Sequence, residues 1–220
     1  MRKLFYEKMF FAVALTFVGG AMDTYTFLHY RAFPVAQSGN TILALANIYT
    51  QHYDQAVKKI IAVLCFFGGV IVARLLKYQL AQIRGWEVGI LFFEAVIFFG
   101  IGFPVLYNHP NIVISIIAFT VSLQWVFFNT IEGKPYVNLY ASGNIKGIGI
   151  NLVDYLKNPQ AKTLCQLKFF MKLVAAFISG AFLSLLFYQR FHVAACFFIS
   201  LLFFCLAIKA LFDHFKKDNV

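Results

Sequence analysis

Charged side chains are scarce in this sequence, since only 13% of its 220 residues are Asp, Glu, Lys or Arg. So few charges cannot supply the polar surface of a soluble globule in which 61% of the residues are hydrophobic. The composition therefore excludes a soluble domain and predicts an all-α integral membrane protein. The lipid bilayer is then its first expected partner.

Acidic residues are especially few, with nine Asp and Glu against 19 Lys and Arg, which gives a formal net charge of +10. In a soluble domain this excess would suggest nucleic acid, but no basic soluble segment is long enough to bind it. The basic residues instead lie between apolar runs and at the chain ends, as the charge bias of cytoplasmic loops requires. We expect no nucleic-acid partner, and the sequence leaves homo-oligomers open.

Motifs for catalysis and metal binding are also missing. The four cysteines show no CxxC or Cys/His spacing, so we expect neither a metal site nor a redox cofactor. All five histidines lie at or beyond the ends of apolar runs, and no Gly-x-Ser-x-Gly elbow is present. We therefore expect no catalytic residues, no cofactor and no enzymatic activity.

Long apolar runs are abundant, and each has about the length of one bilayer crossing. The first continues without a cleavage site and a polar mature start, so we interpret it as a retained helix and not as a signal peptide. The six runs are Met9–Leu28, Ala56–Leu76, Glu87–Tyr107, Asn111–Ile131, Leu167–Tyr188 and His192–Phe212.

Six crossings place most basic loops on one side of the membrane, which the positive-inside rule makes the cytoplasm, together with both termini. These loops contain Arg2, Lys3, Lys8, Lys77, Arg84, Lys134, Lys157, Lys162, Lys216 and Lys217. Arg31, Lys58, Lys59 and Arg190 are the exceptions. An alternative with eight crossings would bring Lys58 and Lys59 inside. It would move Arg74, Lys77 and Arg84 outside and would require two short segments to span the membrane.

Two short segments share one plan. Each follows a proline and an extended stretch, reads Ser-Gly-Asn, and continues into a short apolar or amphipathic run. Ser and Asn oxygens can accept hydrogen bonds from the free N–H groups of a first helical turn, so a helix is expected to begin at each tripeptide. The run after the first tripeptide ends near Ile48, about half of the roughly 20 residues that a spanning helix needs. We therefore predict half-helices or re-entrant segments at Ser38-Gly39-Asn40 and Ser142-Gly143-Asn144.

The two segments divide a single membrane domain, 1–220, into similar halves of about 9–107 and 111–212. Each half reads long run, Ser-Gly-Asn segment, long run, long run, and Gly68-Gly69 is echoed by Ser179-Gly180. Because three crossings is an odd number, the second half must be inverted relative to the first, as in many transporters. We expect the two tripeptides to meet near the bilayer midplane, where irregular backbone is tolerated if it lines water or is buried in protein. The other interpretation makes them interfacial turns between helices.

Three polar side chains fall inside the apolar runs. Asp23 is a candidate binding or proton-titrating residue, because an intramembrane carboxylate is costly; alternatively it caps a neighbouring segment or pairs with Arg31. Glu94 is a second titrating candidate, or an ion-pair partner of Arg74 or Lys172. Gln124 can contribute to a polar site, although hydrogen bonding between helices explains it equally well.

Several of these motifs, in this order and spacing, resemble the YoaK-type family of bacterial inner-membrane proteins. They are Gly19-Gly20-Ala21-Met22-Asp23, Phe33 to Thr41, Ser122-Leu123-Gln124 and Ala141 to Asn144. The resemblance implies about six helices and a family without an established activity. In relatives, a threonine is usual where Ser38 stands, and an asparagine is common where Trp125 stands.

The sequence supports two hypotheses of function. The first is a transporter or channel-like protein for a small polar or anionic solute, whose site is formed by the two tripeptides together with Asp23 and Gln124. The second is a membrane scaffold or regulatory partner that transports nothing and whose polar residues serve packing alone.

Overall fold

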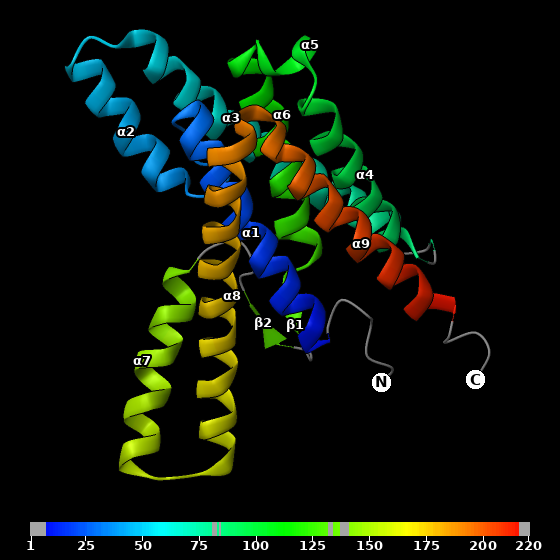
Figure 1. The fold of residues 1–220 in the computed structure, drawn as a ribbon. Helices are drawn as coiled ribbons and strands as arrows, with labels where there is room; N and C mark the ends of the chain where they lie inside the picture. Colours follow the sequence, from blue (N-terminus) through cyan, green and yellow to red (C-terminus); the bar gives the residue numbers. More distant parts are fainter. Residues whose placement is uncertain (1–7, 81–82, 84, 132–133, 137–140, 216–220) are drawn as a thin grey trace.

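The structure is a computed structural model that describes residues 8–80, 83, 85–131, 134–136 and 141–215. Nearly all of the described chain is helical (Figure 1). The elements are α1 (Met9–Tyr30), α2 (Gln37–Tyr49), α3 (Tyr53–Leu80), α4 (Trp86–Ile101), α5 (Pro104–Tyr107), α6 (Pro110–Phe127), β1 (Thr130–Ile131), β2 (Lys134–Pro135), α7 (Ser142–Lys157), α8 (Ala161–Phe191), the 3₁₀ helix η2 (His192–Ala195) and α9 (Cys196–Phe215). The prediction of an all-α protein is confirmed at this level.

Two of the predicted runs end earlier than expected. The run predicted to reach Tyr107 ends as helix at Ile101, because Phe103 is extended and Pro104 starts a new short helix. Proline disfavours helical backbone in the residue before it, which accounts for the break. The run predicted to reach Ile131 ends at Phe127, after which β1 pairs antiparallel with β2. The sequence pattern gave no indication of this small hairpin.

Four described segments are long and apolar enough to cross a bilayer: Met9–Tyr30, Tyr53–Leu80, Pro110–Phe127 and Ala161–Phe215. The last has 55 residues and contains both α8 and α9, between which the chain reverses direction at η2 (Figure 1). His192 adopts a positive φ of 49° at this reversal. Helix α4 is shorter, with 16 residues.

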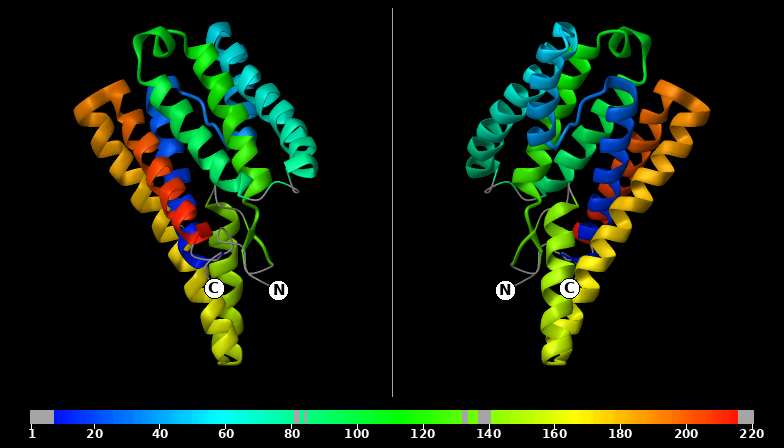
Figure 2. Two further views of the ribbon diagram at one scale, coloured as in Figure 1. Left: turned by 90° about the vertical axis from the view of Figure 1, so that its right-hand side faces the viewer. Right: turned by 90° about the vertical axis from the view of Figure 1, so that its left-hand side faces the viewer.

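The long helices alternate in direction. In Figure 1, α1, α4 and α8 run upward, whereas α3, α6 and α9 run downward. Helix α1 packs against α8, α3 against α6, and α4 against α9, while α2 lies on α3 and α7 lies on α8. Figure 2 shows that α7 and the first part of α8 extend beyond the other helices at the lower end.

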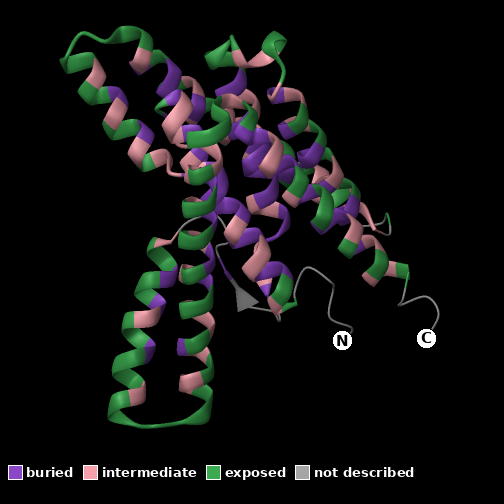
Figure 3. Cartoon of the chain, viewed as in Figure 1, coloured by how far each residue is buried: buried purple, intermediate pink, exposed green. Residues whose placement is uncertain are grey.

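The buried core lies mainly among α1, α4, α6 and α9 (Figure 3). Large side chains from each of these helices are fully enclosed, such as Met22, Phe98, Ile117 and Phe203. The outer helices instead expose large apolar side chains, such as Leu45 on α2 and Leu156 on α7. Exposed apolar surface of this extent is suited to lipid and not to water.

Glycines bring the paired helices into close contact. A Cβ atom on Gly180 of α8 would collide with the backbone carbonyl of Phe17 on α1. In the other pair, a Cβ on Gly69 of α3 would lie 2.8 Å from the carbonyl of Phe119 on α6. Small residues allow this approach of backbones, which is typical of helix packing in membranes. The glycine motifs that echo each other in sequence thus make similar crossings.

Helices α2 and α7 are both short. With 13 and 16 residues, they extend about 20 and 24 Å, less than the roughly 30 Å of a hydrocarbon core. In Figure 1 both begin at mid-height: α2 rises to the end where α1 finishes, and α7 descends to the opposite end. Their lengths favour half-helices over the full crossings of the eight-span alternative.

Some sequence predictions lie outside the described residues. They include the predicted cytoplasmic location of five basic residues, namely Arg2, Lys3, Arg84, Lys216 and Lys217. They also include the extended stretch 137–140 before the second tripeptide.

Candidate functional site

The chain between α1 and α2 folds back along α1. Helix α1 ends at Tyr30, and the left-handed backbone of the next residue, Arg31 (φ 56°), turns the chain. Phe33 then stacks on Phe27, with ring centroids 4.8 Å apart. Farther down, the backbone N–H of Val35 donates a hydrogen bond to the carboxyl group of Asp23. Since Asp23 precedes Phe27 by one helical turn, the segment descends beside α1 before α2 begins.

Asn40 holds the same segment from the other side. Its Oδ1 accepts from the backbone N–H of Phe33 at 2.9 Å, and its Nδ2 donates to the Phe33 carbonyl at 2.6 Å and to Gln37 Oε1 at 3.0 Å. The side chain is fully buried. Asn40 therefore binds both backbone groups of Phe33, as a neighbouring β-strand would. These bonds hold the start of α2 against the returning chain.

The predicted capping role of the first tripeptide is wrong. Helix α2 begins at Gln37 and α7 at Ser142, and the N-cap residues, Ala36 and Ala141, make no side-chain capping bond. Among the hydrogen bonds between described residues, none uses the backbone N–H of Ser38 or Gly39. The first turn of α2 thus keeps free donors, which concentrate the positive end of the helix dipole there.

A cavity of about 330 Å³ lies where the two short helices begin. Ser38 from α2 and Ser142 from α7 both line it, although they are far apart in the sequence. The other lining residues are Val35, Ala36, Gln37, Phe66 and Trp125. We call this space the central cavity. It combines two hydroxyl groups, one amide and a helix N-terminus with aromatic walls, a lining that can hold a small polar or anionic group.

The remaining tripeptide residues have different surroundings. Asn144 is buried like Asn40. A Cβ atom on Gly39 would lie 3.3 Å from the ring of Phe33, so the absence of a side chain at Gly39 leaves room for the returning segment. A Cβ atom on Gly143 would have nothing within 4 Å. Neither glycine is among the residues that line the central cavity.

Two of the intramembrane polar candidates lack partners within the described part of the chain. Both carboxyl oxygens of Glu94 and both amide atoms of Gln124 are buried without a hydrogen bond. The ion pair suggested between Glu94 and Arg74 or Lys172 is wrong, and Arg74 donates instead to the Tyr78 hydroxyl at 2.7 Å. Neither Glu94 nor Gln124 lines the central cavity. Unpaired polar groups at such depth are unfavourable.

In the part of the chain that the structure describes, Asp23 does not form the ion pair with Arg31 that was one of its predicted alternatives. Its Oδ1 is buried without a hydrogen bond among the described residues, so only the other oxygen binds Val35. Arg31 lies over the ring of Phe27, 5.8 Å from the centroid, and makes no ion pair with Asp23 within the described chain. Asp23 thus positions the wall of the cavity, through Val35, and retains one unused acceptor.

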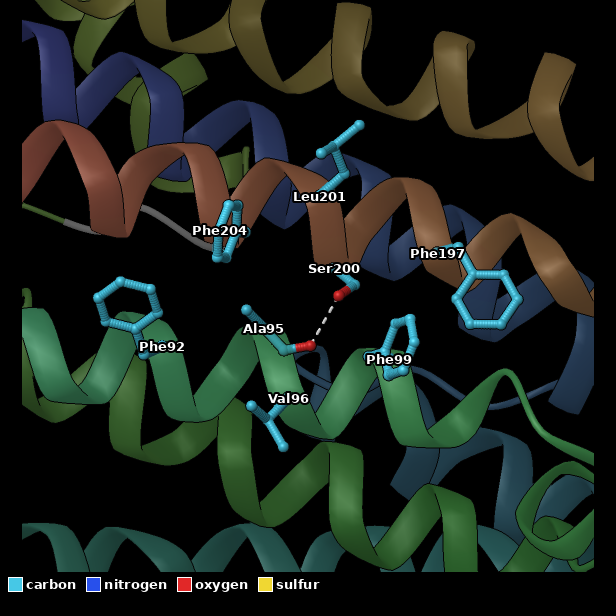
Figure 4. Close-up of a pocket in the computed structure, with 8 residues that line it drawn as sticks. All are labelled: Phe92, Ala95, Val96, Phe99, Phe197, Ser200, Leu201 and Phe204. Carbon is cyan, nitrogen blue, oxygen red and sulfur yellow. Dashed lines mark hydrogen bonds between the residues drawn. The ribbon is translucent and has the colours of Figure 1, made fainter.

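A second hollow, of about 420 Å³, lies between α4 and α9 (Figure 4). Its walls are almost entirely apolar, and four phenylalanines from the two helices surround it. The Ser200 hydroxyl donates to the Ala95 carbonyl at 2.7 Å, so this polar group is satisfied within the protein. The hollow offers no polar group for recognising a solute.

Five residues that line the central cavity were not among the predicted site residues: Val35, Ala36, Gln37, Phe66 and Trp125. Their residue types carry no functional signal, because they face the cavity only through the fold. Two indications were available: Gln37 lies directly before the first tripeptide, and Trp125 follows Gln124 where relatives commonly have an asparagine.

A family profile described as "Protein of unknown function (DUF1275)" matches residues 11–209 of the chain. No curated protein and no solved structure matches it.

Proposed function

Because the chain belongs to the DUF1275 family of unknown function, to which YoaK-type proteins also belong, we propose a role from its geometry: a transporter or channel-like protein for a small polar or anionic solute. The observation that carries this proposal is the central cavity, which Ser38 and Ser142 line from two different short helices. Irregular backbone inside a membrane protein is tolerated where it is buried or lines such a space.

The electrostatics of the cavity favour a solute with negative or electron-rich atoms. The free N–H groups of Ser38 and Gly39 lie at the positive end of α2, and the start of α7 contributes Ser142. Helix N-termini bind anions through such groups. No Asp or Glu is among the lining residues.

An inverted repeat with six crossings is part of the proposal. The helix packing has the symmetry of such a repeat, in which α1, α2, α3 and α4 correspond to α6, α7, α8 and α9. Under this correspondence the α1–α8 pair matches the α3–α6 pair, the α2–α3 pair matches the α7–α8 pair, and α4 pairs with its own counterpart α9. The glycine crossings at Gly69 and Gly180 follow the same exchange. Inverted repeats of this kind bind their substrates where broken or short helices meet near the midplane.

We also propose that the chain lies in the bacterial inner membrane with both termini in the cytoplasm. The count of Lys and Arg in the connections supports this orientation. It places the connection between α7 and α8 on the cytoplasmic side and that between α2 and α3 on the other side.

Transport can be tested with purified protein in liposomes and a panel of anions, amino acids and weak acids. Ser38→Phe and Ser142→Phe would fill the cavity from either side, so each should abolish uptake of any solute that the wild type transports. Thr41→Phe is the matched control, because Thr41 is exposed on α2 and does not line the cavity. Equal uptake by the cavity variants and the control would reject the cavity as the pathway.

A scaffold without transport is the second candidate, and the hydrogen bonds of Asn40 favour it. This side chain binds Phe33 and Gln37 completely within the protein, as a purely structural residue would. The scaffold would be supported if no solute of the panel were transported by folded protein.

A further inference from the structure

A second polar hollow, of about 290 Å³, lies near the lower end of the molecule, where the first turns of α8 pass the beginning of α1. Lys168 and Lys172 line it together with Met9, Leu164, Cys165 and Phe169. The two lysines are four residues apart, so they lie on the same face of α8. We call this space the basic crevice.

The positive charge of the basic crevice is not compensated. Within the described part of the chain, neither Lys168 nor Lys172 makes a hydrogen bond or an ion pair. No acidic residue is among those that line the crevice. By contrast, Lys8 and Lys209 both pair with Asp213. Two like charges one turn apart repel each other, and a bound anion would relieve that repulsion.

The crevice also has an apolar part. Met9 from α1 and Leu164 and Phe169 from α8 form its walls beside the lysines. A small inorganic anion would gain nothing from these side chains, whereas a ligand with a charged head and a hydrocarbon tail would contact both parts. The lining therefore favours an amphipathic anion.

The depth of the lysines agrees with such a ligand. The close crossing of Gly180 with Phe17 lies near the middle of α1, and Lys172 and Lys168 precede Gly180 by about 12 and 18 Å along α8. Half of a hydrocarbon core is about 15 Å. With the crossing at the midplane, the Cα atoms of the two lysines lie on either side of the hydrocarbon boundary, from which long lysine side chains can reach lipid phosphates.

We propose that the basic crevice binds an anionic phospholipid. Its phosphate lies between Lys168 and Lys172, and the start of an acyl chain lies against Met9, Leu164 and Phe169. Basic pockets at the membrane surface select anionic lipids in this way. The site is separate from the central cavity and does not depend on transport.

Native mass spectrometry of the full-length protein in detergent tests this proposal, with phosphatidylglycerol and phosphatidylcholine added in equal amounts. The wild type should retain phosphatidylglycerol in preference to phosphatidylcholine. The double variant Lys168→Gln/Lys172→Gln should retain about tenfold less phosphatidylglycerol. Lys146→Gln/Lys157→Gln on α7 is the matched control, because it removes the same charge from the same hairpin outside the crevice.

Three results would contradict the proposal that the basic crevice binds an anionic phospholipid. They are equal retention by the wild type and the Lys168/Lys172 variant, an equal loss in the control, and displacement of the lipid by millimolar inorganic phosphate. The last would identify a binding site for free anions. Lys168 and Lys172 are exposed, so both double variants should fold, and unchanged thermal unfolding confirms that a loss of lipid is a loss of binding.

Discussion

Asp23 and Asn40 act on the backbone of the segment that returns from the end of α1. Asp23 accepts from Val35, and Asn40 binds both backbone groups of Phe33. Buried N–H and C=O groups outside helices need such partners, because the surrounding helices and lipid offer none. These two side chains therefore hold the returning segment in place beside the start of α2.

Replacing Asn40 should destabilise the protein. Asn40→Ala leaves the N–H and the carbonyl of Phe33 without partners, so we expect a loss of about 2 to 5 kcal/mol in the free energy of unfolding. Asn47→Ala on the same helix is the control, since no hydrogen bond of that side chain is known among the described residues. Denaturant unfolding in detergent measures both. Equal stability of the two variants would contradict the bridging role of Asn40.

Substitutions of Asp23 separate its structural role from a role in transport. Asp23→Asn keeps an oxygen that can accept from Val35, so it should fold as the wild type does, whereas Asp23→Ala should lose about 1 to 3 kcal/mol. If the carboxyl group also carries a proton during transport, Asp23→Asn should abolish uptake and Asp23→Glu should keep part of it. Thermal unfolding and liposome uptake are measured on the same preparations. Full uptake by Asp23→Asn would make Asp23 a structural residue alone.

At the scale of elements, pairs of helices are held together by close backbone crossings. Gly20 and Gly180 form one such crossing between α1 and α8, and Gly69 forms the other between α3 and α6. Membrane helices gain little from the hydrophobic effect inside lipid, so close packing has to supply much of their association. These glycines should therefore tolerate no side chain.

Neighbouring glycines on α3 provide a direct comparison. A Cβ on Gly69 would collide with Ser122 and approach the Phe119 carbonyl, whereas nothing lies within 4 Å of one on Gly68. Gly69→Ala should lower the free energy of unfolding by about 1 to 3 kcal/mol. Gly68→Ala should be neutral or stabilise the helix by up to about 1 kcal/mol. Similar melting temperatures for the two variants would exclude a tight crossing at Gly69.

At the scale of the whole molecule, the position of α2 decides the number of crossings. Helix α2 ends beside the start of α3, at the same end of the molecule at which α1 finishes (Figure 1). If the chain enters the membrane after α1 and α2 brings it back to the same side, only the long helices cross the membrane. A full crossing by α2 would reverse the side of every connection up to the next short helix.

Labelling with a membrane-impermeant thiol reagent distinguishes these topologies. In a cysteine-free background, His52→Cys at the start of α3 should react from outside the cell, and Asn158→Cys after α7 should react only after the membrane is opened. Eight crossings predict that His52→Cys is protected in intact cells. Arg190→Cys at the end of α8, which both topologies place outside and which is exposed, serves as the positive control.

The sequence by itself determined the class of the protein, the approximate positions of its long helices, and the short helices at Ser38 and Ser142. These features follow from composition and local pattern, because a bilayer requires long apolar helices and a short apolar run cannot span it. Only the tertiary structure placed Ser38 and Ser142 at one cavity, joined Asp23 to Val35, and left Glu94 without the suggested ion pair. Such contacts join segments that local pattern does not relate. They depend on how the chain turns after Arg31 and on which helices cross at Gly69 and Gly180.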